Sequence, residues 1–249
     1  MKKTTVSGAI LATGVALLFM ANPSFAQEAA TPSAKRAGPT LKITITNLTG
    51  GPGGETTTPE GMSAGGQVFT PILVANHKAG VSLFTLGQPA SVPLQDLAES
   101  GDTSMLKSAL TSNPDVLDVQ TTDPKPLPPG QSVTLTVKTK DGFDHISVAA
   151  MLVPTNAGFF ALNDVEVPNG NKSITVYSPA YDAGSKADDE LCANIPGPPN
   201  VCKGTGFINT PTGVGFVHIH SGIHGIGDLS ETFFDWQNPV AQIVIQRVP

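Results

Sequence analysis

Hydrophobic and polar residues alternate in several short stretches of the chain. In residues 41–48, LKITITNL, the side chains of Leu41, Ile43 and Ile45 alternate with lysine and threonine. This period of two is typical of a strand with one buried face. The same pattern occurs in residues 131–140, QSVTLTVKTK. Further β-rich stretches lie at 145–154, 172–179, 214–222 and 240–248. Glycine, proline and asparagine separate these stretches, which predicts strands joined by tight turns.

Only residues 93–113, PLQDLAESGDTSMLKSALTSN, have apolar residues near helical spacing. Gly101 divides this stretch, and Asp102 or Thr103 can cap its second half. The pattern as a whole predicts an all-β chain, an antiparallel β-sandwich or barrel with a short helical insertion.

The first 26 residues have the three parts of a signal peptide. Lys2 and Lys3 precede an apolar run over residues 6–20, and small residues lead to a cleavage position after Ala26. The run is short and interrupted by glycine and threonine, so we do not expect a membrane span. Residues 27–40 have no apolar periodicity and predict a disordered leader. Residues 41–249 have the length of one domain.

The net charge of the chain limits the kinds of partner that it can bind. The formal net charge is −6, and the predicted signal peptide carries two lysines and no acid, so the mature chain is more acidic still. An acidic surface repels nucleic acid and anionic lipid. We expect a secreted or periplasmic monomer that does not bind nucleic acid.

The chain has two cysteines, Cys192 and Cys202. An oxidising compartment pairs such residues and closes the loop between them. No further ligand lies at the spacing of a zinc site. We therefore predict a disulfide.

Residues 181–190, YDAGSKADDE, contain Asp182, Asp188, Asp189 and Glu190. Calcium is held by six to eight oxygens, and loops at one end of a sandwich can bring carboxylates together. The spacing is not that of the calcium loop found in paired-helix sensors, and Lys186 places a positive charge within the segment. From the residues alone, a solvated loop remains the simpler interpretation.

The segment FVHIHSGIHG contains His218, His220 and His224. Residues two apart on a strand project from the same face, and a third histidine could complete a site for zinc, copper or iron. The alternative is that the histidines pack and form hydrogen bonds at a strand end. We predict that they lie near one end of the sandwich without forming a tight metal site. Nucleophile motifs are absent from the sequence, so we do not expect an enzyme.

The chain resembles the spondin domain, the N-terminal module of F-spondin and mindin, in its bacterial exported single-domain branch. The resemblance rests on the order of several segments: ITITNLTGG, FTPILVANH, SLFTLGQPAS, LQDLAESGDTSMLKSAL, AAMLVPTNAGFFAL, YDAGSKADDE, HIHSGIHGIGDL and NPVAQIVIQRV. It implies a sandwich of about eight antiparallel strands, and a calcium ion held by three acidic side chains.

The three acidic positions that the resemblance implies fall on Ala157, Asp182 and Lys186. Only Asp182 is an acid, and calcium affinity follows the number and charge of the ligands. Asn156 and Asp188, with Asp189 and Glu190, are the side chains that could supply further oxygens. We predict weak calcium binding or none, with the Lys186 ammonium pointing toward Asp182 and Ala157 in place of the ion.

Two functions are open at this point. The first is a non-enzymatic, adhesion-type module that binds an extracellular or envelope component, as the animal relatives suggest by analogy. The second is a metal-binding protein or metal-dependent enzyme built on His218, His220 and His224, in which case the fold could be a small cupin-like barrel.

Overall fold

The computed structural model describes residues 39–50, 56–57, 63–170 and 172–248. The predicted signal peptide (1–26) and all but the last two residues of the predicted leader (27–40) lie outside this part of the chain. The first strand begins at Thr40, next to the predicted start of the domain. Among the described residues, no helix is long and apolar enough to cross a membrane.

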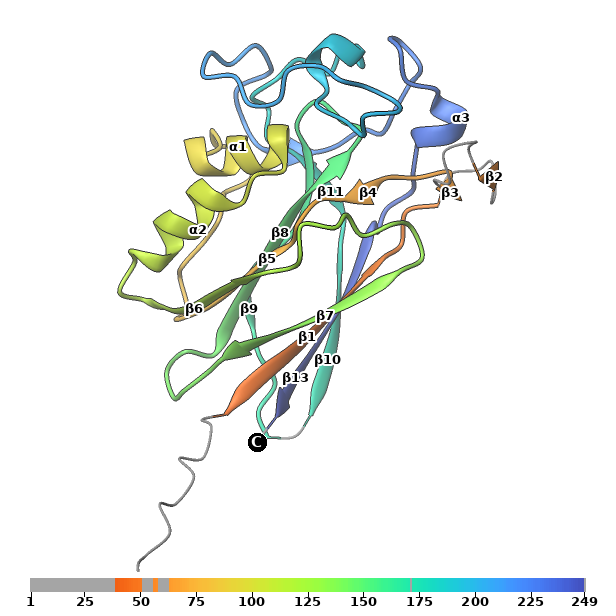
Figure 1. The fold of residues 1–249 in the computed structure, drawn as a ribbon. Coiled ribbons are helices and arrows are strands. Elements are labelled where there is room, and N and C mark those ends of the chain that lie inside the picture. Colours follow the sequence, from red (N-terminus) through yellow and green to blue (C-terminus); the bar gives the residue numbers. More distant parts are fainter. Residues whose placement is uncertain (1–38, 51–55, 58–62, 171, 249) are drawn as a thin grey trace, which may run out of the picture. The chain divides into compact units, whose positions relative to one another are not determined.

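The strands form two antiparallel sheets and one small hairpin (Figure 1). The four-stranded sheet has the order β10-β13-β1-β7. Its strands are β1 (Thr40–Asn47), β7 (Ser132–Lys138), β10 (Ser173–Ser178) and β13 (Ala241–Val248). The hairpin pairs β2 (Thr56–Thr57) with β3 (Ser63–Ala64).

The seven-stranded sheet has the order β12-β11-β9-β8-β5-β6, and β4 pairs with one end of β8. Its strands are β4 (Val68–Phe69), β5 (Leu73–His77), β6 (Val116–Thr121), β8 (His145–Val153), β9 (Gly158–Glu166), β11 (Ala180–Asp182) and β12 (His218–Ile219). The helices are α1 (Val92–Ser100), α2 (Ser104–Thr111), α3 (Glu231–Phe234) and the 3-10 turn Cys192–Asn194.

The main hydrophobic core lies between the two sheets. Leu41, Ile43 and Ile45 of β1 face it, as their alternation predicts, and the ring of Phe69 packs against Phe160 with 4.4 Å between the centroids. The two sheets are separate layers, which confirms the predicted sandwich rather than the alternative of a closed barrel.

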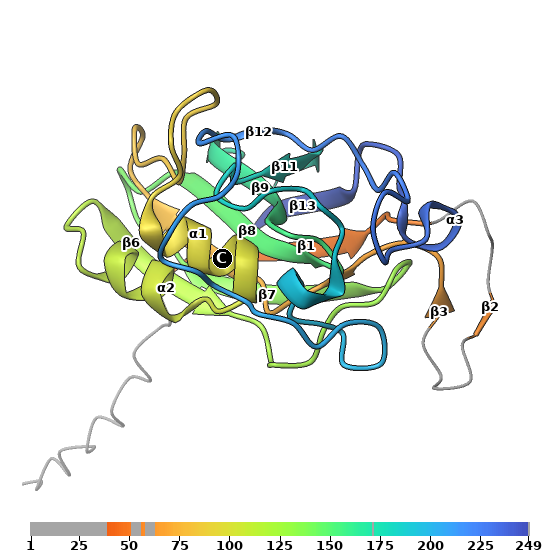
Figure 2. The same cartoon turned by 90° about the horizontal axis from the view of Figure 1, so that it is seen from above.

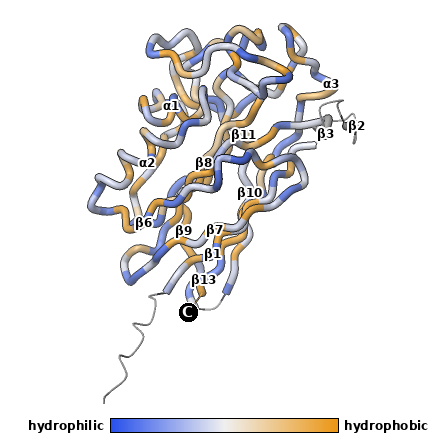
Figure 3. The backbone as a smooth tube through the Cα atoms, in the orientation of Figure 1, coloured by the Kyte–Doolittle hydropathy of each residue, from blue (hydrophilic) through white to orange (hydrophobic). Residues whose placement is uncertain are grey.

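A second core lies on the outer face of the seven-stranded sheet, where α1 and α2 cover it (Figures 1 and 2). Successive residues of one strand therefore enter different cores: Phe159 contacts the helix side and Phe160 the sandwich side. Strand β8 is hydrophobic along most of its length, as Figure 3 shows, because both of its faces are buried.

The break between α1 and α2 lies at Gly101, as predicted. This residue has a φ of 74°, and a Cβ there would lie 2.5 Å from the Cγ2 of Thr70, so only glycine fits. Of the two predicted caps, Asp102 acts on the second helix: its carboxylate accepts the N–H of Ser104 at 2.7 Å. Thr103 makes no side-chain cap.

The six stretches predicted as strands all contain strands, but one of them is mostly irregular. In residues 214–222 only His218 and Ile219 pair, with β11, and the rest runs as loop. The strands β5, β6 and β9 do not show simple alternation and were not predicted from periodicity.

The predicted disulfide between Cys192 and Cys202 is confirmed. It lies within the long segment between β11 and β12, at the end of the sandwich where the loops gather at the top of Figure 1. Its two cysteines contact the core between the sheets, and Cys202 is almost fully buried.

A polar pair is buried inside the seven-stranded sheet. His77 is inaccessible to solvent, and its Nε2 lies 2.9 Å from the hydroxyl of Ser147 while its Nδ1 lies 2.8 Å from the carbonyl oxygen of Lys78. The carboxylate of Asp164 is 3.9 Å from Nδ1, and the ring of His145 stacks at 6.4 Å. Burial outweighs the Asp164 charge and lowers the pKa of His77.

We expect the double variant Cys192→Ala/Cys202→Ala to unfold with a free energy about 2–3 kcal/mol lower than the unaltered chain, because the closed loop no longer restricts the unfolded state. Urea denaturation measures this difference. Reductant should lower the stability of the unaltered chain to the same level and leave the variant unchanged. An unaltered chain that does not respond to reductant would contradict the prediction.

The lowered pKa of His77 also sets a pH dependence. Below about pH 6.5 the unfolded chain binds a proton at His77 and the folded chain does not, so stability falls as the pH falls. From pH 7.5 to 5.5 the unaltered chain should lose about 1 kcal/mol more than His77→Gln. Denaturation at both pH values tests this, and His224→Gln, which changes an exposed histidine, should keep the full decline.

Candidate functional site

The last residue of β11 begins the candidate site. Asp182 pairs with Gly158 of β9 on one side and with His218 of β12 on the other. Because side chains alternate along strands, the side chains of Asp182, His218 and His220 are directed to the same face of the sheet. The edge of the seven-stranded sheet therefore collects a carboxylate and two imidazoles.

The carboxylate of Asp182 is buried, with 1% of the residue exposed. Its Oδ1 accepts the N–H of Gly184, and its Oδ2 has no hydrogen-bond partner. Burial, and then the negative charge of Asp188, raise the pKa of Asp182 to about 8. Two carboxyl groups this close favour either a shared proton or a bound cation.

A cavity of about 350 Å³ opens at this position. It is lined by Asp182, Lys186, Ala187, Asp188, Thr212, Gly213, Val214 and His218. Asp182 and Asp188 thus face a space that an ion, water or a small polar group can enter.

His220 lies beside Asp182 and is also buried. Its Nδ1 accepts the N–H of Gly222 at 3.1 Å, its ring packs edge-on against Trp236 at 4.9 Å, and burial lowers the pKa of the imidazole. The neutral ring therefore carries its proton on Nε2, which has no hydrogen-bond partner and lies 3.8 Å from the Oδ2 of Asp182.

The other two histidines have different surroundings. His218 lies within 3.2 Å of the carbonyl oxygen of Phe216 through Nδ1, and His224 contacts the hydroxyl of Ser221 through Nε2 at 3.0 Å. The group of potential cation ligands that converges in the described part of the chain is Asp182, Asp188 and His220, with ligand atoms within 4.8 Å of one another. His220 thus converges with two carboxylates and not with His218 and His224.

Two of the side chains that could supply oxygen ligands to a cation, those of Asp189 and Asn156, are already engaged in hydrogen bonds within the protein. The Oδ1 of Asp189 accepts the Nδ2 of Asn156 at 2.8 Å and the N–H of Leu191 at 3.0 Å, and its Oδ2 accepts the Nδ2 of Asn194. Asn156 also accepts the N–H of Glu190. Asp189 and Asn156 therefore fix the course of the loop.

Glu190 has a similar structural role. It is buried, and its two carboxylate oxygens accept the N–H groups of His224 at 2.6 Å and Ile226 at 2.9 Å. The acidic segment thus divides into two acids that face the cavity and two that hold backbone amides.

The calcium set that the resemblance implies does not fit this chain. Ala157 is fully buried in the apolar core under α1 and α2, and its side chain offers no oxygen. Position 186 is a lysine. Only Asp182 remains of the three acids.

The prediction that Lys186 points toward Asp182 is wrong. The ammonium of Lys186 donates to the carbonyl oxygens of Asn194 and Thr205, both at 2.7 Å, and no ion pair joins Lys186 to Asp182 in the described residues. Both carbonyl groups belong to the segment around the disulfide. Glu99, near the end of α1, lies close to the same ammonium. An ammonium gains more from two buried carbonyl oxygens and a nearby carboxylate than from Asp182.

Glu99 is a buried acid that the sequence did not single out. It lies on α1, has no exposed surface, and its Oε2 accepts the N–H of Ile208 at 2.9 Å. Burial raises its pKa, and the positive charge of Lys186 opposes that rise. The apolar spacing of α1 gives no signal for it, because Glu99 lies two residues from Leu97 and therefore on nearly the opposite side of the helix.

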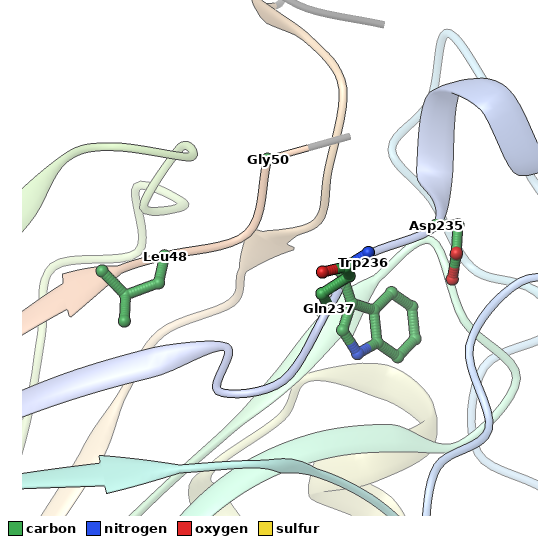
Figure 4. A pocket seen from close by; sticks show the side chains of 5 residues that line it. All are labelled: Leu48, Gly50, Asp235, Trp236 and Gln237. Carbon is green, nitrogen blue, oxygen red and sulfur yellow. The ribbon is translucent and has the colours of Figure 1, made fainter. Parts of the chain in front are cut away.

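A second cavity, of about 300 Å³, lies beside Trp236 (Figure 4). It is lined by Leu48, Gly50, Asp235, Trp236 and Gln237. The Oδ1 of Asp235 accepts the N–H of Ile223 at 3.0 Å, so this carboxylate also serves the backbone of the loop. The ring of Trp236, which lines this cavity, also packs against His220, and this residue was not predicted to take part.

Substitution of Lys186 tests its structural role. Lys186→Met should lower the free energy of unfolding by about 3 kcal/mol, because two buried carbonyl oxygens and Glu99 lose their positive partner. Lys203→Met changes an exposed lysine of the same loop and should have little effect. Equal stability of the two variants, measured by urea denaturation, would show that Lys186 is not a structural cation.

A comparison with families of known proteins supports the resemblance drawn from the sequence. The family model described as Spondin_N matches residues 57–189, slightly more than half of the chain. The matched range contains Ala157, Asp182, Lys186 and Asp188, and ends before the cysteines and His218. No curated protein matches the chain. By its match, its antiparallel sandwich and its ordered segments, the chain belongs to the Spondin_N family.

Proposed function

We propose that the protein is an exported, non-enzymatic binding module, of adhesion type, that attaches to an envelope or extracellular component through the loop end of its sandwich. The observation that carries this proposal is a set of exposed apolar side chains beside the polar cavity. They are Leu86, Val214, Phe216 and Ile219, which are 42–61% exposed. Exposed apolar residues of this density, next to convergent polar groups, are typical of a binding surface.

These four residues come from two segments that lie side by side. The N–H of Gly87 donates to the carbonyl of Val217 at 2.8 Å, and the N–H of Val217 donates to Gln88 at 2.9 Å. The ring of Phe216 packs against His218, which lines the cavity. Val214 lines the cavity with Asp182 and Asp188, and Phe216 adjoins it through His218, whereas Ile219 points to the opposite face of β12.

Export is supported by several features of the chain. A disulfide within an irregular segment is typical of proteins that fold in an oxidising compartment. Residues 1–26 have the composition of a signal peptide, and the remaining chain is strongly acidic. These features favour the periplasm or the exterior of the cell as the location.

The buried Ser147 and His77 do not argue for an enzyme. Their geometry, with Asp164 nearby, has the residue types of a hydrolytic triad. However, Ser147 and His77 have no exposed surface, so a substrate cannot reach the hydroxyl. The N–H of Asp164 also donates to this hydroxyl at 3.0 Å, which gives the trio a structural role.

The proposed binding face can be tested with purified mature protein and washed envelope fragments from the producing cells. We expect the protein to sediment with the fragments, and Val214→Asp/Phe216→Asp to reduce the bound fraction about tenfold, because charges oppose burial of this face. Met105→Asp/Tyr177→Asp changes two exposed apolar residues elsewhere and should bind normally.

Two outcomes would overturn the proposal. Equal sedimentation of both double variants would show that this face does not bind the envelope. A full-length chain that stays in the cytoplasmic fraction, with residues 1–26 intact, would show that it is not exported.

A further inference from the structure

The carboxylate of Asp182 is only partly satisfied by the protein itself. Its side chain is 1% exposed, yet its Oδ2 accepts no hydrogen bond, and the Nε2 of His220 is 3.8 Å away, too far for one. Leaving a carboxylate oxygen unpaired in a buried position is costly, so such an atom in a folded protein normally has a partner. Asp182 lines the cavity of about 350 Å³, so that partner can come from the cavity.

The charges around this cavity favour a positively charged guest. Asp182 and Asp188 both line it, and ligand atoms of the two carboxylates lie within 4.8 Å of each other. Among the described residues, no lysine or arginine forms an ion pair with either carboxylate. Lys186 also lines the cavity, but its ammonium donates to two backbone carbonyl oxygens. The two carboxylates therefore lack a counter-charge from the described part of the chain.

The donor set suits an organic cation better than a metal ion. Calcium takes six to eight oxygens, and two of the acidic positions that the family resemblance implies are Ala157 and Lys186. His220 turns a protonated Nε2 toward Asp182, because its Nδ1 accepts an N–H, and so it offers no lone pair. A guanidinium needs only the two carboxylates, since its planar group donates hydrogen bonds to both from one rigid fork.

The remaining walls of the cavity suit the stem of an arginine side chain. Val214 lines the cavity and is 61% exposed. The ring of Phe216, 42% exposed, packs against the ring of His218, which also lines the cavity. The methylene groups of an arginine can pack on Val214, while an aromatic ring beside the guanidinium attracts its charge. Apolar residues next to that arginine would meet the same exposed side chains.

We propose that Asp182 and Asp188 bind the guanidinium of an arginine of a partner protein, with apolar neighbours of that arginine seated against Val214 and Phe216. This inference rests on the proposed binding face and names its partner, a protein with an exposed arginine. Arginine is among the residues that most often dominate the energy of an interface. The carboxylates add specificity to an apolar contact, because a partner without a positive charge leaves them unpaired.

The first test uses the mature chain, freed of metal by chelator, and the blocked peptide acetyl-Leu-Arg-Leu-amide. Titration followed by NMR chemical shifts should show saturable binding. The same peptide with citrulline, the uncharged isostere of arginine, should bind at least about tenfold more weakly. Asp188→Asn should weaken binding of the arginine peptide by about the same factor. Asp141→Asn removes an exposed acid that lies outside the cavity and should bind the peptide normally.

Three results of this titration would overturn the proposal. They are equal affinity for the arginine and citrulline peptides, unchanged affinity in Asp188→Asn, and displacement of the peptide by millimolar calcium, which would show that the carboxylates hold a metal. The side chain of Asp188 is not buried, so its variant should fold, and a thermal melt checks this.

A second test separates this inference from the binding face itself. Envelope fragments treated with phenylglyoxal, which blocks arginine side chains, should bind about tenfold less protein than fragments whose lysines have been acetylated. Equal binding after both treatments, or full binding to fragments stripped of protein by protease, would refute the arginine partner and leave the binding face standing. If untreated fragments do not bind, the binding face is refuted, and the peptide titration still decides whether the cavity takes a guanidinium.

Discussion

The loop end of the sandwich depends on buried charges that bind the backbone. Residues 183–217 form no strand, and their peptide groups would lack partners in a compact structure. Lys186 donates to two carbonyls of this segment, Glu99 accepts one of its N–H groups, and Glu190 accepts two from the segment that follows. Charged side chains thus replace the hydrogen bonds that a sheet would supply. They also fix the space into which Asp182 and Asp188 project.

Much of the fold follows from local patterns. The alternation in β1, β7, β10 and β13 is readable because one face of the four-stranded sheet meets water. The strands of the other sheet were harder to predict, because α1 and α2 cover its outer face and the alternation disappears in β5 and β9. Gly101 was predicted as a helix break because a left-handed residue after a helix favours glycine.

The candidate site was less predictable, because its members are sorted by contacts that sequence spacing does not contain. Asp182, Asp188, Asp189 and Glu190 are alike in sequence, and only the course of the loop decides which face the cavity and which bind amides. His218 of β12 and His220 just after the strand share a face, but their protonated nitrogens are set by Gly222 and Phe216. Lys186 was misassigned because its carbonyl partners lie 8 and 19 residues further along the chain.

The shortness of β12 has a consequence for the behaviour of the protein in solution. Strand β12 is one edge of the seven-stranded sheet. It has only two residues, and irregular chain flanks it on both sides. A long, regular edge strand would offer a row of free peptide groups with which a strand of another molecule could pair. Here that row is nearly absent, and apart from Ile219 the exposed apolar side chains nearby, Leu86, Val214 and Phe216, lie on loops. This edge of the sheet can therefore offer an apolar surface to a partner without promoting edge-to-edge association of the molecules into fibres.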